Sequence, residues 1–259
     1  MTGDVRDFEL AKEATEGIDI VVHLAAKTSV LSSFEDPISD MEVNIRGALN
    51  YLEAGRINKI RKFVFVSSNA VLGEAATPMD ERRGATPASP YGIGKLTGEN
   101  YCRIFSKSMG LNTLVLRIGN VYGPGSKYKT SVIAKFFQAA LKSESLQVYG
   151  DGNQKRNFIY VTDVVDGIVK ASESNLAGET FQLATELEST INDIAAHIKK
   201  MVEHKLKIVV DITTTPRNAN EVKFSFADPS MAQRLLDWCP QVSVETGLMQ
   251  TMEYFLSLR

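Results

Sequence analysis

The sequence has 259 residues, of which 44% are hydrophobic and 23% are charged, and its formal net charge is −2. These values are typical of a globular α/β protein with a sizeable core. A nearly neutral chain without a basic block gives no reason to expect nucleic acid as a partner, and no apolar run has the length of a membrane span. The two cysteines, Cys102 and Cys239, lie far apart and in no metal-ligand spacing. We therefore expect a cytoplasmic protein with no disulfide framework and no metal site.

Short apolar segments alternate with longer amphipathic segments in the first half of the chain. Residues 18–24, 62–66 and 112–117 are rich in apolar β-branched, leucine and phenylalanine side chains, which is typical of strands buried on both faces of a parallel sheet. Between them, residues 40–55 and 89–110 have helical spacing. This alternating order predicts right-handed βαβ units and a three-layer α/β fold with a parallel sheet.

The second half of the chain has a more mixed pattern. Helices are predicted there at residues 132–141, 191–202 and 246–258, short strands at residues 158–161 and 180–183, and a polar, turn-rich segment at residues 213–220. This change of pattern predicts a second, mixed lobe from about Gly123 onward, some of whose strands interleave with the first sheet.

The pentapeptide Tyr91-Gly92-Ile93-Gly94-Lys95 is the first segment with a chemical signature. Tyrosine and lysine four positions apart lie on the same face of a helix. A free phenol has a pKa near ~10 and is a poor base at neutral pH, whereas a neighbouring ammonium lowers that pKa by stabilising the phenolate. The pair therefore predicts a tyrosine that takes or gives a proton. Because so short a pattern also occurs by chance, a surface helix pair is an equally good interpretation of the pentapeptide alone.

A pair of serines, Ser67-Ser68, directly follows the predicted strand at residues 62–66. Open α/β sheets bind their ligands at the carboxyl ends of the strands, so Ser68 is placed to hydrogen-bond a substrate oxygen while Tyr91 moves the proton. The alternative role for Ser68 is that of a helix or turn cap. Residues 87–90 contain two prolines and predict a stiff turn that delivers the next helix to the strand ends.

Further short blocks occur along the chain in a characteristic order. They are His23-Leu24-Ala25-Ala26, Asn44, Ser67-Ser68-Asn69-Ala70-Val71, Ser89-Pro90-Tyr91-x-x-x-Lys95, Leu116-Arg117-x-x-Asn120-Val121-Tyr122-Gly123-Pro124-Gly125, Gly150-Asp151-Gly152, Arg156-Asn157-Phe158-Ile159-Tyr160-Val161-x-Asp163, and Ala227-Asp228-Pro229-Ser230 before Trp238. In order and spacing these blocks resemble the extended short-chain dehydrogenase/reductases, and most closely the NAD-dependent epimerase/dehydratase family that includes UDP-glucose 4-epimerase. The resemblance runs from about Gly3 to the C-terminus.

The resemblance implies both an architecture and an activity. The architecture is a Rossmann-like core over residues 1–122, joined by a returning strand near residues 180–184, and a mainly substrate-binding lobe over residues 123–259. The activity is that of a sugar-nucleotide epimerase or dehydratase, with NAD as cofactor and a nucleotide-sugar such as a UDP-sugar as substrate. In such enzymes a sugar hydroxyl loses its proton to a tyrosine while NAD takes the hydride, which later returns to the other face of the sugar.

The resemblance also implies roles for catalytic and cofactor-binding residues. Tyr91 would be the acid/base, Lys95 would hold the nicotinamide ribose and tune Tyr91, and Ser68 would complete the triad. Two pairs of residues match positions close to the cofactor, namely Asp4 and Val5 near the adenine, and Ala25 and Ala26.

Three further residues match positions that bind the nucleotide-sugar. Asn120 and Arg156 match positions that contact its diphosphate and base, and the guanidinium of Arg156 suits bidentate diphosphate binding. A surface ion pair is the alternative role for Arg156. Arg217 lies in a segment that resembles the late nucleotide-binding loop of the family, although it stands four residues before Glu221 rather than the usual three.

The sequence departs from the family pattern at its start. Family members open with a strand, a Gly-x-x-Gly-x-x-Gly turn, a helix and a second strand, and the sequence begins at the equivalent of the third strand's end. Because the backbone N–H groups of that turn hold the pyrophosphate, we expect NAD binding by this chain alone to be impaired. The absent first strand would lie beside residues 18–24, so we expect that edge to be covered in a homo-oligomer or by a rearranged segment.

Two other functions stay open at this point. A cofactor-independent hydrolase could reuse Ser68, Tyr91 and Lys95, since serine with a Tyr/Lys base is a workable nucleophile arrangement. The sequence has no Gly-x-Ser-x-Gly elbow to support this hypothesis. A non-catalytic binding protein that kept the fold and lost NAD binding is the other hypothesis, because function resides in sites rather than in folds.

Overall fold

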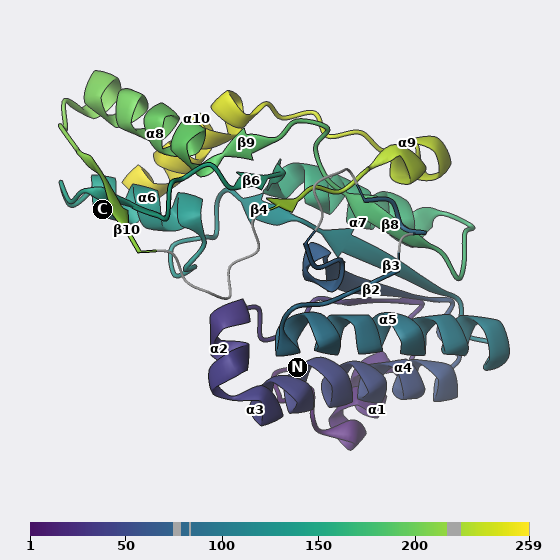
Figure 1. Cartoon of the computed structure of the whole chain (residues 1–259). Helices are drawn as coiled ribbons and strands as arrows, with labels where there is room; N and C mark the ends of the chain where they lie inside the picture. Colours follow the sequence, from purple (N-terminus) through teal and green to yellow (C-terminus); the bar gives the residue numbers. More distant parts are fainter. Residues whose placement is uncertain (75–78, 83, 217–223, 259) are drawn as a thin grey trace.

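A four-stranded parallel sheet lies at the centre of the computed structural model, which describes residues 1–74, 79–82, 84–216 and 224–258 (Figure 1). The strands stand in the order β1-β2-β3-β8. Their bounds are β1 Ile20–His23, β2 Lys62–Ser68, β3 Thr113–Ile118 and β8 Thr180–Leu183. The predicted parallel sheet is confirmed, and β8 is the strand that returns to it from the second half of the chain. Among the described residues β1 forms one edge of this sheet.

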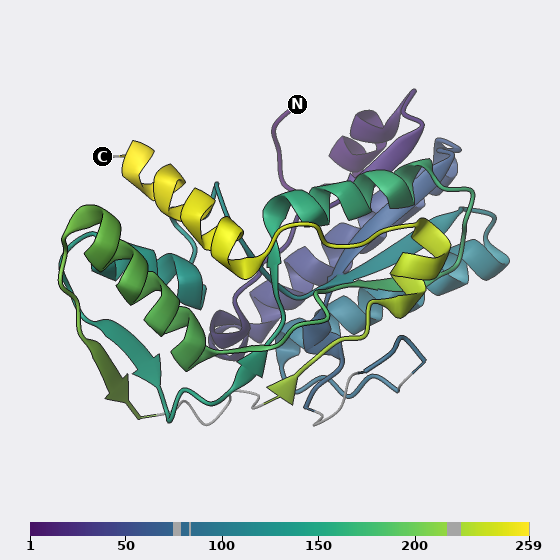
Figure 2. The ribbon, with the colours of Figure 1, turned by 90° about the horizontal axis from the view of Figure 1, so that it is seen from above.

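Helices cover both faces of the sheet, so the core has the predicted three layers (Figures 1 and 2). On one face lie α4 (Gly47–Ile57) and α5 (Pro90–Ser108), and on the other lie α7 (Val161–Glu173) and α9 (Ser230–Leu236). Successive side chains of β2 point to opposite faces of the sheet and pack against the helices of both layers. Phe63 and Phe65 pack towards α4 and α5, whereas Val64 joins the cluster around Trp238 on the opposite face.

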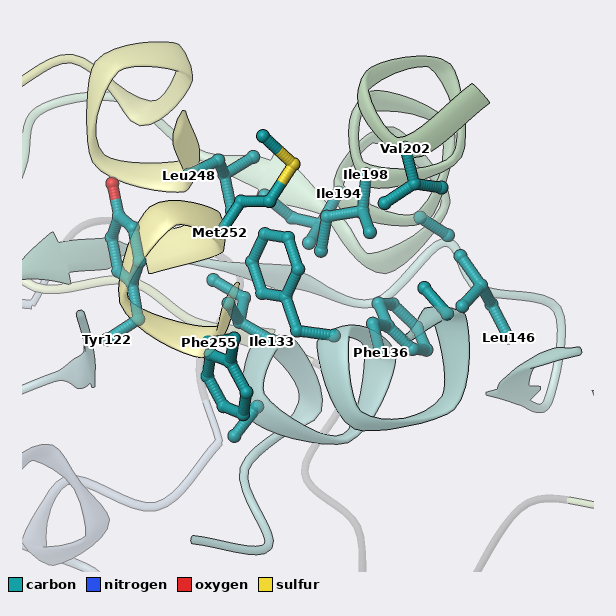
Figure 3. Close-up of a cluster of buried hydrophobic side chains, with 14 of the residues drawn as sticks. Tyr122, Ile133, Phe136, Leu146, Ile194, Ile198, Val202, Leu248, Met252 and Phe255 are labelled. Atoms are coloured by element: carbon teal, nitrogen blue, oxygen red, sulfur yellow. The ribbon is translucent and has the colours of Figure 1, made fainter. Parts of the chain in front are cut away.

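The second lobe lies beside the sheet and has a core of its own between three helices (Figure 3). The helices are α6 (Val132–Ala140), α8 (Ile191–Leu206) and α10 (Val244–Ser257), as predicted within a few residues. They pack beside a parallel pair, β5 (Leu146–Tyr149) and β10 (Ile212–Thr215). The prediction of a turn-rich segment at residues 213–220 is therefore wrong up to Thr215, because backbone pairing with β5 overrides its polar composition. Residues 217–220 lie outside the described part of the chain.

The remaining elements are short. They are α1 Phe8–Thr15, α2 Val30–Glu35, α3 Pro37–Met41, the π-helical turn η1 Glu42–Arg46, the 3₁₀ turn η2 Asn69–Val71, and the strands β4 Asn120–Tyr122, β6 Lys155–Arg156, β7 Phe158–Tyr160, β9 Ser189–Thr190 and β11 Phe224–Ser225. β4 pairs with β7, and β6 lies between β11 and β9. No helix in the described part of the chain is long and apolar enough to cross a membrane.

The predicted helix at residues 40–55 is a run of three segments, α3, η1 and α4. Asn44 lies in the π-helical turn and fixes the loop that follows β1. Its Oδ1 accepts from the backbone N–H of Lys27 at 2.9 Å, and its Nδ2 donates to the Lys27 carbonyl at 3.0 Å. The π-turn therefore ties the start of α4 to the carboxyl end of β1, where a functional site is expected.

Helix α5 approaches the sheet closely because its inner face carries glycine. A Cβ on Gly98 would stand 2.4 Å from Cζ of Phe65, so only glycine allows this spacing. The helix starts at Pro90, and the side chain of Ser89 caps it by accepting from the N–H of Gly92 at 3.1 Å. The first turns of α5 are thereby held against the carboxyl ends of the strands.

Candidate active site

The predicted catalytic residues meet at the carboxyl end of β2. Tyr91 and Lys95 lie on the first turns of α5 with 7% and 3% of their surfaces exposed, and Ser68 is the last residue of β2. The hydroxyl of Ser68 accepts from the N–H of Ala70 at 3.2 Å, and Ser68 also hydrogen-bonds Tyr91. The capping role considered for Ser68 is therefore present, and its hydroxyl also lies against the tyrosine, whereas its contact with a substrate oxygen stays a prediction.

The pKa of Tyr91 differs from the expected one. Burial raises this pKa above its ordinary value, and the hydrogen bond from Ser68 only partly opposes the rise. The expectation that Lys95 lowers the pKa of Tyr91 is wrong for this structure, because the ammonium is turned to the sheet. Its Nζ donates to the carbonyl of Val66 at 2.9 Å and lies 5.0 Å from the ring centroid of Phe65.

Lys95 occupies an unusually dry position for an ammonium group. Burial lowers its pKa to about 8, while the negative charges of Asp40 and Glu99 act in the opposite direction. Glu99 lies one turn further along α5 and forms a buried ion pair with Arg117, with 2.7 Å between Nη2 and Oε2. It also accepts from the hydroxyl of Ser67 at 2.5 Å. Glu99 thus extends the Tyr91–Lys95 row by a further turn.

His23 is the last residue of β1, and its ring stacks on two phenylalanines of the neighbouring strand β2. Its centroid is 5.9 Å from that of Phe63 and 6.0 Å from that of Phe65. Nε2 of His23 is buried and has no hydrogen-bond partner among the described residues. Burial, and secondly the charge of Lys95, lower the pKa of His23 to about 4, so the ring is neutral at pH 7.

Sequence reasoning did not assign roles to Asp40, Glu99 or His23. Glu99 could have been found from its spacing, because it continues the four-residue step from Tyr91 to Lys95. His23 belongs to a block that resembles the family, but its neighbour Lys95 is remote in sequence. Asp40 gives no local signal, since its burial depends on the packing of α3 against α5.

The four residues expected near the cofactor lie around the carboxyl end of β1 and the start of α4. Ala25 and Ala26 follow β1 directly, in the loop that Asn44 fixes. Val5 is anchored at the same end of α4: its carbonyl accepts from Nδ2 of Asn50 at 3.0 Å. Asp4 is exposed and paired with Arg6, whose hydrogen bonds hold the pKa of the carboxyl near 2.

Lys95 and the loop after β1 fit the ribose of a nicotinamide cofactor. The ammonium of Lys95 has three N–H donors, and among the described residues the structure gives it one hydrogen-bond acceptor, the carbonyl of Val66. Its remaining donors suit the hydroxyls of a ribose, and the small side chains of Ala25 and Ala26 leave the nearby backbone open.

The residues expected to bind the nucleotide-sugar lie on the strands of the second lobe. Asn120 is exposed on β4 and donates through Nδ2 to the carbonyl of Asn157 at 3.2 Å. Arg156 is half-buried on β6, and its Nη1 donates to the carbonyl of Lys155 at 2.8 Å. The pairing of β4 with β7 aligns Asn120 with Phe158, which brings the segments of Asn120 and Arg156 together. Arg217 lies outside the described residues.

Asn157 and Leu72 lie close to the site and are both buried. Asn157 is 1% exposed and uses both ends of its amide. Its Nδ2 donates to the carbonyl of Thr185 at 2.6 Å, while its Oδ1 accepts from the N–H of Ala227 at 3.1 Å. Leu72 is fully buried with Val71 and Met79.

Comparison with known proteins decides the family. A model of the NAD dependent epimerase/dehydratase family matches residues 1–184. The chain belongs to this family. It is 33% identical to a putative UDP-glucose 4-epimerase of Methanocaldococcus jannaschii, over 98% of this chain and 83% of that protein.

Solved structures of family members share the fold closely. The UDP-glucose 4-epimerase of Thermotoga maritima with UDP-glucose has a TM-score of 0.93 and 33% identity, covering 99% of this chain and 84% of that one. The UDP-glucuronic acid 4-epimerase of Bacillus cereus, in complex with UDP-glucuronic acid and NAD, has a TM-score of 0.91 and 30% identity, covering 99% and 81% of the two chains. The predicted resemblance and the predicted fold class are confirmed.

Metal and cysteine chemistry receive no support from the described residues. Among them, no group of three His, Cys, Asp or Glu side chains is placed to hold a metal ion. Cys102 is buried and Cys239 is exposed, and both are free thiols.

Proposed function

We propose that this member of the family is an NAD-dependent epimerase of nucleotide-sugars, and that its substrate is a UDP-sugar. One observation carries the proposal: buried Tyr91 hydrogen-bonds Ser68 one helical turn from Lys95, at the carboxyl end of a parallel strand. The ligands of the similar structures support the choice of substrate, since one holds UDP-glucose and another holds UDP-glucuronic acid with NAD.

In the proposed mechanism, Tyr91 takes the proton of a sugar hydroxyl and later returns one. Ser68 would position that hydroxyl by its own hydroxyl group, and the burial of Tyr91 limits the access of water to the proton transfer. Lys95 would hold the ribose of the cofactor with its remaining N–H donors, and it places an ammonium one turn from Tyr91. Bound NAD would supply the acceptor and donor of the hydride.

Recognition of the nucleotide-sugar is proposed for the second lobe. Asn120 and Arg156 would contact its diphosphate and base, with the guanidinium of Arg156 facing the negative charge. A role for Arg217 stays a prediction, because it lies outside the described residues. Asp4, Val5, Ala25 and Ala26 are proposed to border the cofactor.

We also propose that a second copy of the chain covers the open edge of β1. Ile20, Val21 and Val22 are half-buried along this edge, and β1 contains no charged side chain that would oppose pairing with another chain. A dimer in light scattering, with slow amide exchange along β1, would support a homo-oligomer that uses this edge. A monomer with fast exchange there would contradict it. The two free thiols suit a reducing compartment such as the cytosol.

Two measurements test the proposed function. Calorimetric titration with NAD, followed by an assay of UDP-glucose epimerisation at carbon 4, should give binding and turnover. The Tyr91→Phe variant should lose about 10²-fold to 10⁴-fold in kcat and keep its affinity for the UDP-sugar. Turnover of the wild type without NAD binding, or an unaffected variant, would overturn the proposed mechanism.

The same preparations separate the two alternatives. A cofactor-independent hydrolase would cleave a p-nitrophenyl ester and lose that activity on Ser68→Ala, but the comparisons give this hypothesis no support. A non-catalytic binding protein would bind the UDP-sugar without turning it over at any NAD concentration.

A further inference from the structure

Asp40 is a buried carboxylate that the mechanism above does not use. It lies on α3, is 2% exposed, and faces the first turns of α5. Its Oδ1 is 3.6 Å from the point where a Cβ on Gly94 would stand, directly beside Lys95 in the chain. Burying a carboxylate costs free energy unless a partner compensates its charge, so the position of Asp40 calls for such a partner.

The hydrogen bonds of Asp40 compensate it only in part. Asn44 donates to its carboxylate, and the second oxygen, Oδ2, is buried without a hydrogen-bond partner among the described residues. The described residues also give Asp40 no ion pair within contact distance. The negative charge of Asp40 is therefore not neutralised by a cation in direct contact, and it interacts with cations that lie further away.

The other carboxylate near Lys95 differs in this respect. Glu99 binds Arg117 through both of its oxygens and accepts from the hydroxyl of Ser67. Its negative charge is thus largely cancelled by the guanidinium beside it. Of the two carboxylates that act on Lys95, Asp40 is the one whose charge is not already paired.

Two cations act on the Asp40 carboxylate, Lys27 and Lys95, and of these two Lys95 is the buried one. Lys27, in the loop after β1, is exposed and donates from Nζ to the hydroxyl of Ser39 at 2.5 Å. His23 on β1 has a pKa near 4 and is neutral at pH 7. Tyr91 on α5 is uncharged, and the charge of Asp40 helps to keep it so by raising its pKa.

We infer that Asp40 is a positioning residue whose buried carboxylate is the counter-ion that keeps Lys95 charged beside Tyr91. Burial raises the pKa of Asp40, and the charges of Lys27 and Lys95 oppose that rise. Conversely, the carboxylate opposes the loss of the Lys95 proton that burial favours. The two buried groups therefore stabilise each other's charge across the contact between α3 and α5, with no direct ion pair.

The ionisation of Lys95 in the ligand-free chain tests this inference directly. NMR of the side-chain ε position in ¹³C-labelled lysine follows the titration, and a Lys95→Met variant assigns the signal. The Asp40→Asn variant, which keeps the shape and removes the charge, should lower the midpoint of Lys95 from near 8 by about one pH unit. Asp40→Glu, which keeps the charge, should restore most of the shift.

The matched control removes the charge of a residue that belongs to the same helical run as Asp40 but does not face the site. Glu42 begins the π-turn and pairs with Arg46 at 3.0 Å. Glu42→Gln should leave the midpoint of Lys95 within ~0.2 unit of the wild type, since a half-exposed charge is screened by solvent. An unchanged midpoint in Asp40→Asn, or an equal shift in Glu42→Gln, would overturn the inference.

A second readout rests on the proposed function. If Lys95 must be charged for turnover, the alkaline limb of the kcat profile should move to lower pH in Asp40→Asn by the same amount as the NMR midpoint. Failure of the epimerase assay would remove this readout and leave the titration as it stands. A shifted titration with an unshifted kcat profile would show that Asp40 holds the charge of Lys95 but does not act on catalysis, which contradicts its role as a positioning residue.

Discussion

The two halves of the proposed site differ in how firmly their side chains are held before any ligand binds. At the sheet, Tyr91 and Lys95 are buried, and Lys95 bonds the backbone of β2. In the second lobe, Asn120 is exposed and Arg156 is half-buried, and both donate to backbone carbonyls close by. The proton-transfer half of the proposed site is therefore part of the core, whereas the recognition half lies on the surface. Substitutions in the first half should cost stability as well as activity, and those in the second should affect binding alone.

The largest effect is expected where the core and the site share a buried charge pair. Glu99→Ala leaves the guanidinium of Arg117 buried without its partner, which typically costs about 3–5 kcal/mol of the free energy of unfolding. Urea denaturation followed by circular dichroism measures this loss. Glu99→Gln, which keeps an acceptor for Ser67, should cost less, and equal stability of all three proteins would contradict the proposed coupling of core and site.

The acid sensitivity of the fold should come in part from His23. Its pKa is about 4 in the folded protein against an ordinary 6.5, so between these values the unfolded chain binds a proton that the folded chain excludes. The contribution is fully present above pH 6.5 and is lost as the pH falls towards 4, by about 3 kcal/mol. The other two histidines, His197 and His204, are exposed on α8.

A substitution isolates this contribution from that of the carboxylates. His23→Phe keeps a ring on Phe63 and Phe65 and has no titrating group, so its stability should fall less steeply over the same pH range. Parallel curves of unfolding free energy against pH for wild type and variant would rule out the buried neutral histidine.

A smaller loss is expected where the second lobe meets the returning strand. Asn157→Asp removes the donor that bonds the carbonyl of Thr185 and places a carboxylate against it, at an expected cost of about 1–3 kcal/mol. Thermal unfolding measures the change. A variant as stable as the wild type would show that the amide at this position is not required.

The smallest effect on stability is expected at Asn120. Its side chain is exposed and makes one weak bond, so Asn120→Ala should change the free energy of unfolding by less than ~0.5 kcal/mol. If the residue contacts the UDP-sugar, KM should rise several-fold at nearly constant kcat. A fall in kcat equal to that of Tyr91→Phe would break the division between the two halves of the site.

Local pattern was sufficient for much of the fold. The three buried strands of the first half, helix α5 and the three helices of the second lobe follow from periodicity and composition, since each is specified by residues near one another in sequence. Local pattern did not predict the helices α1, α2, α7 and α9, the paired strands β5 and β10, or the short strands β4, β6, β9 and β11. Thr213, Thr214 and Thr215 are polar and become a strand only because the backbone of β5 lies beside them.

For the site, the sequence was sufficient to identify Ser68, Tyr91 and Lys95 as neighbours at the end of a strand, because spacing on one helix and order in a parallel sheet determine that. The pKa values of these groups, by contrast, depend on the tertiary structure. Whether Lys95 faces Tyr91 or the sheet, and whether Asp40 is buried, depends on the packing of α3, α5 and β2. Desolvation is a property of everything that surrounds a group, and no run of neighbouring residues records it.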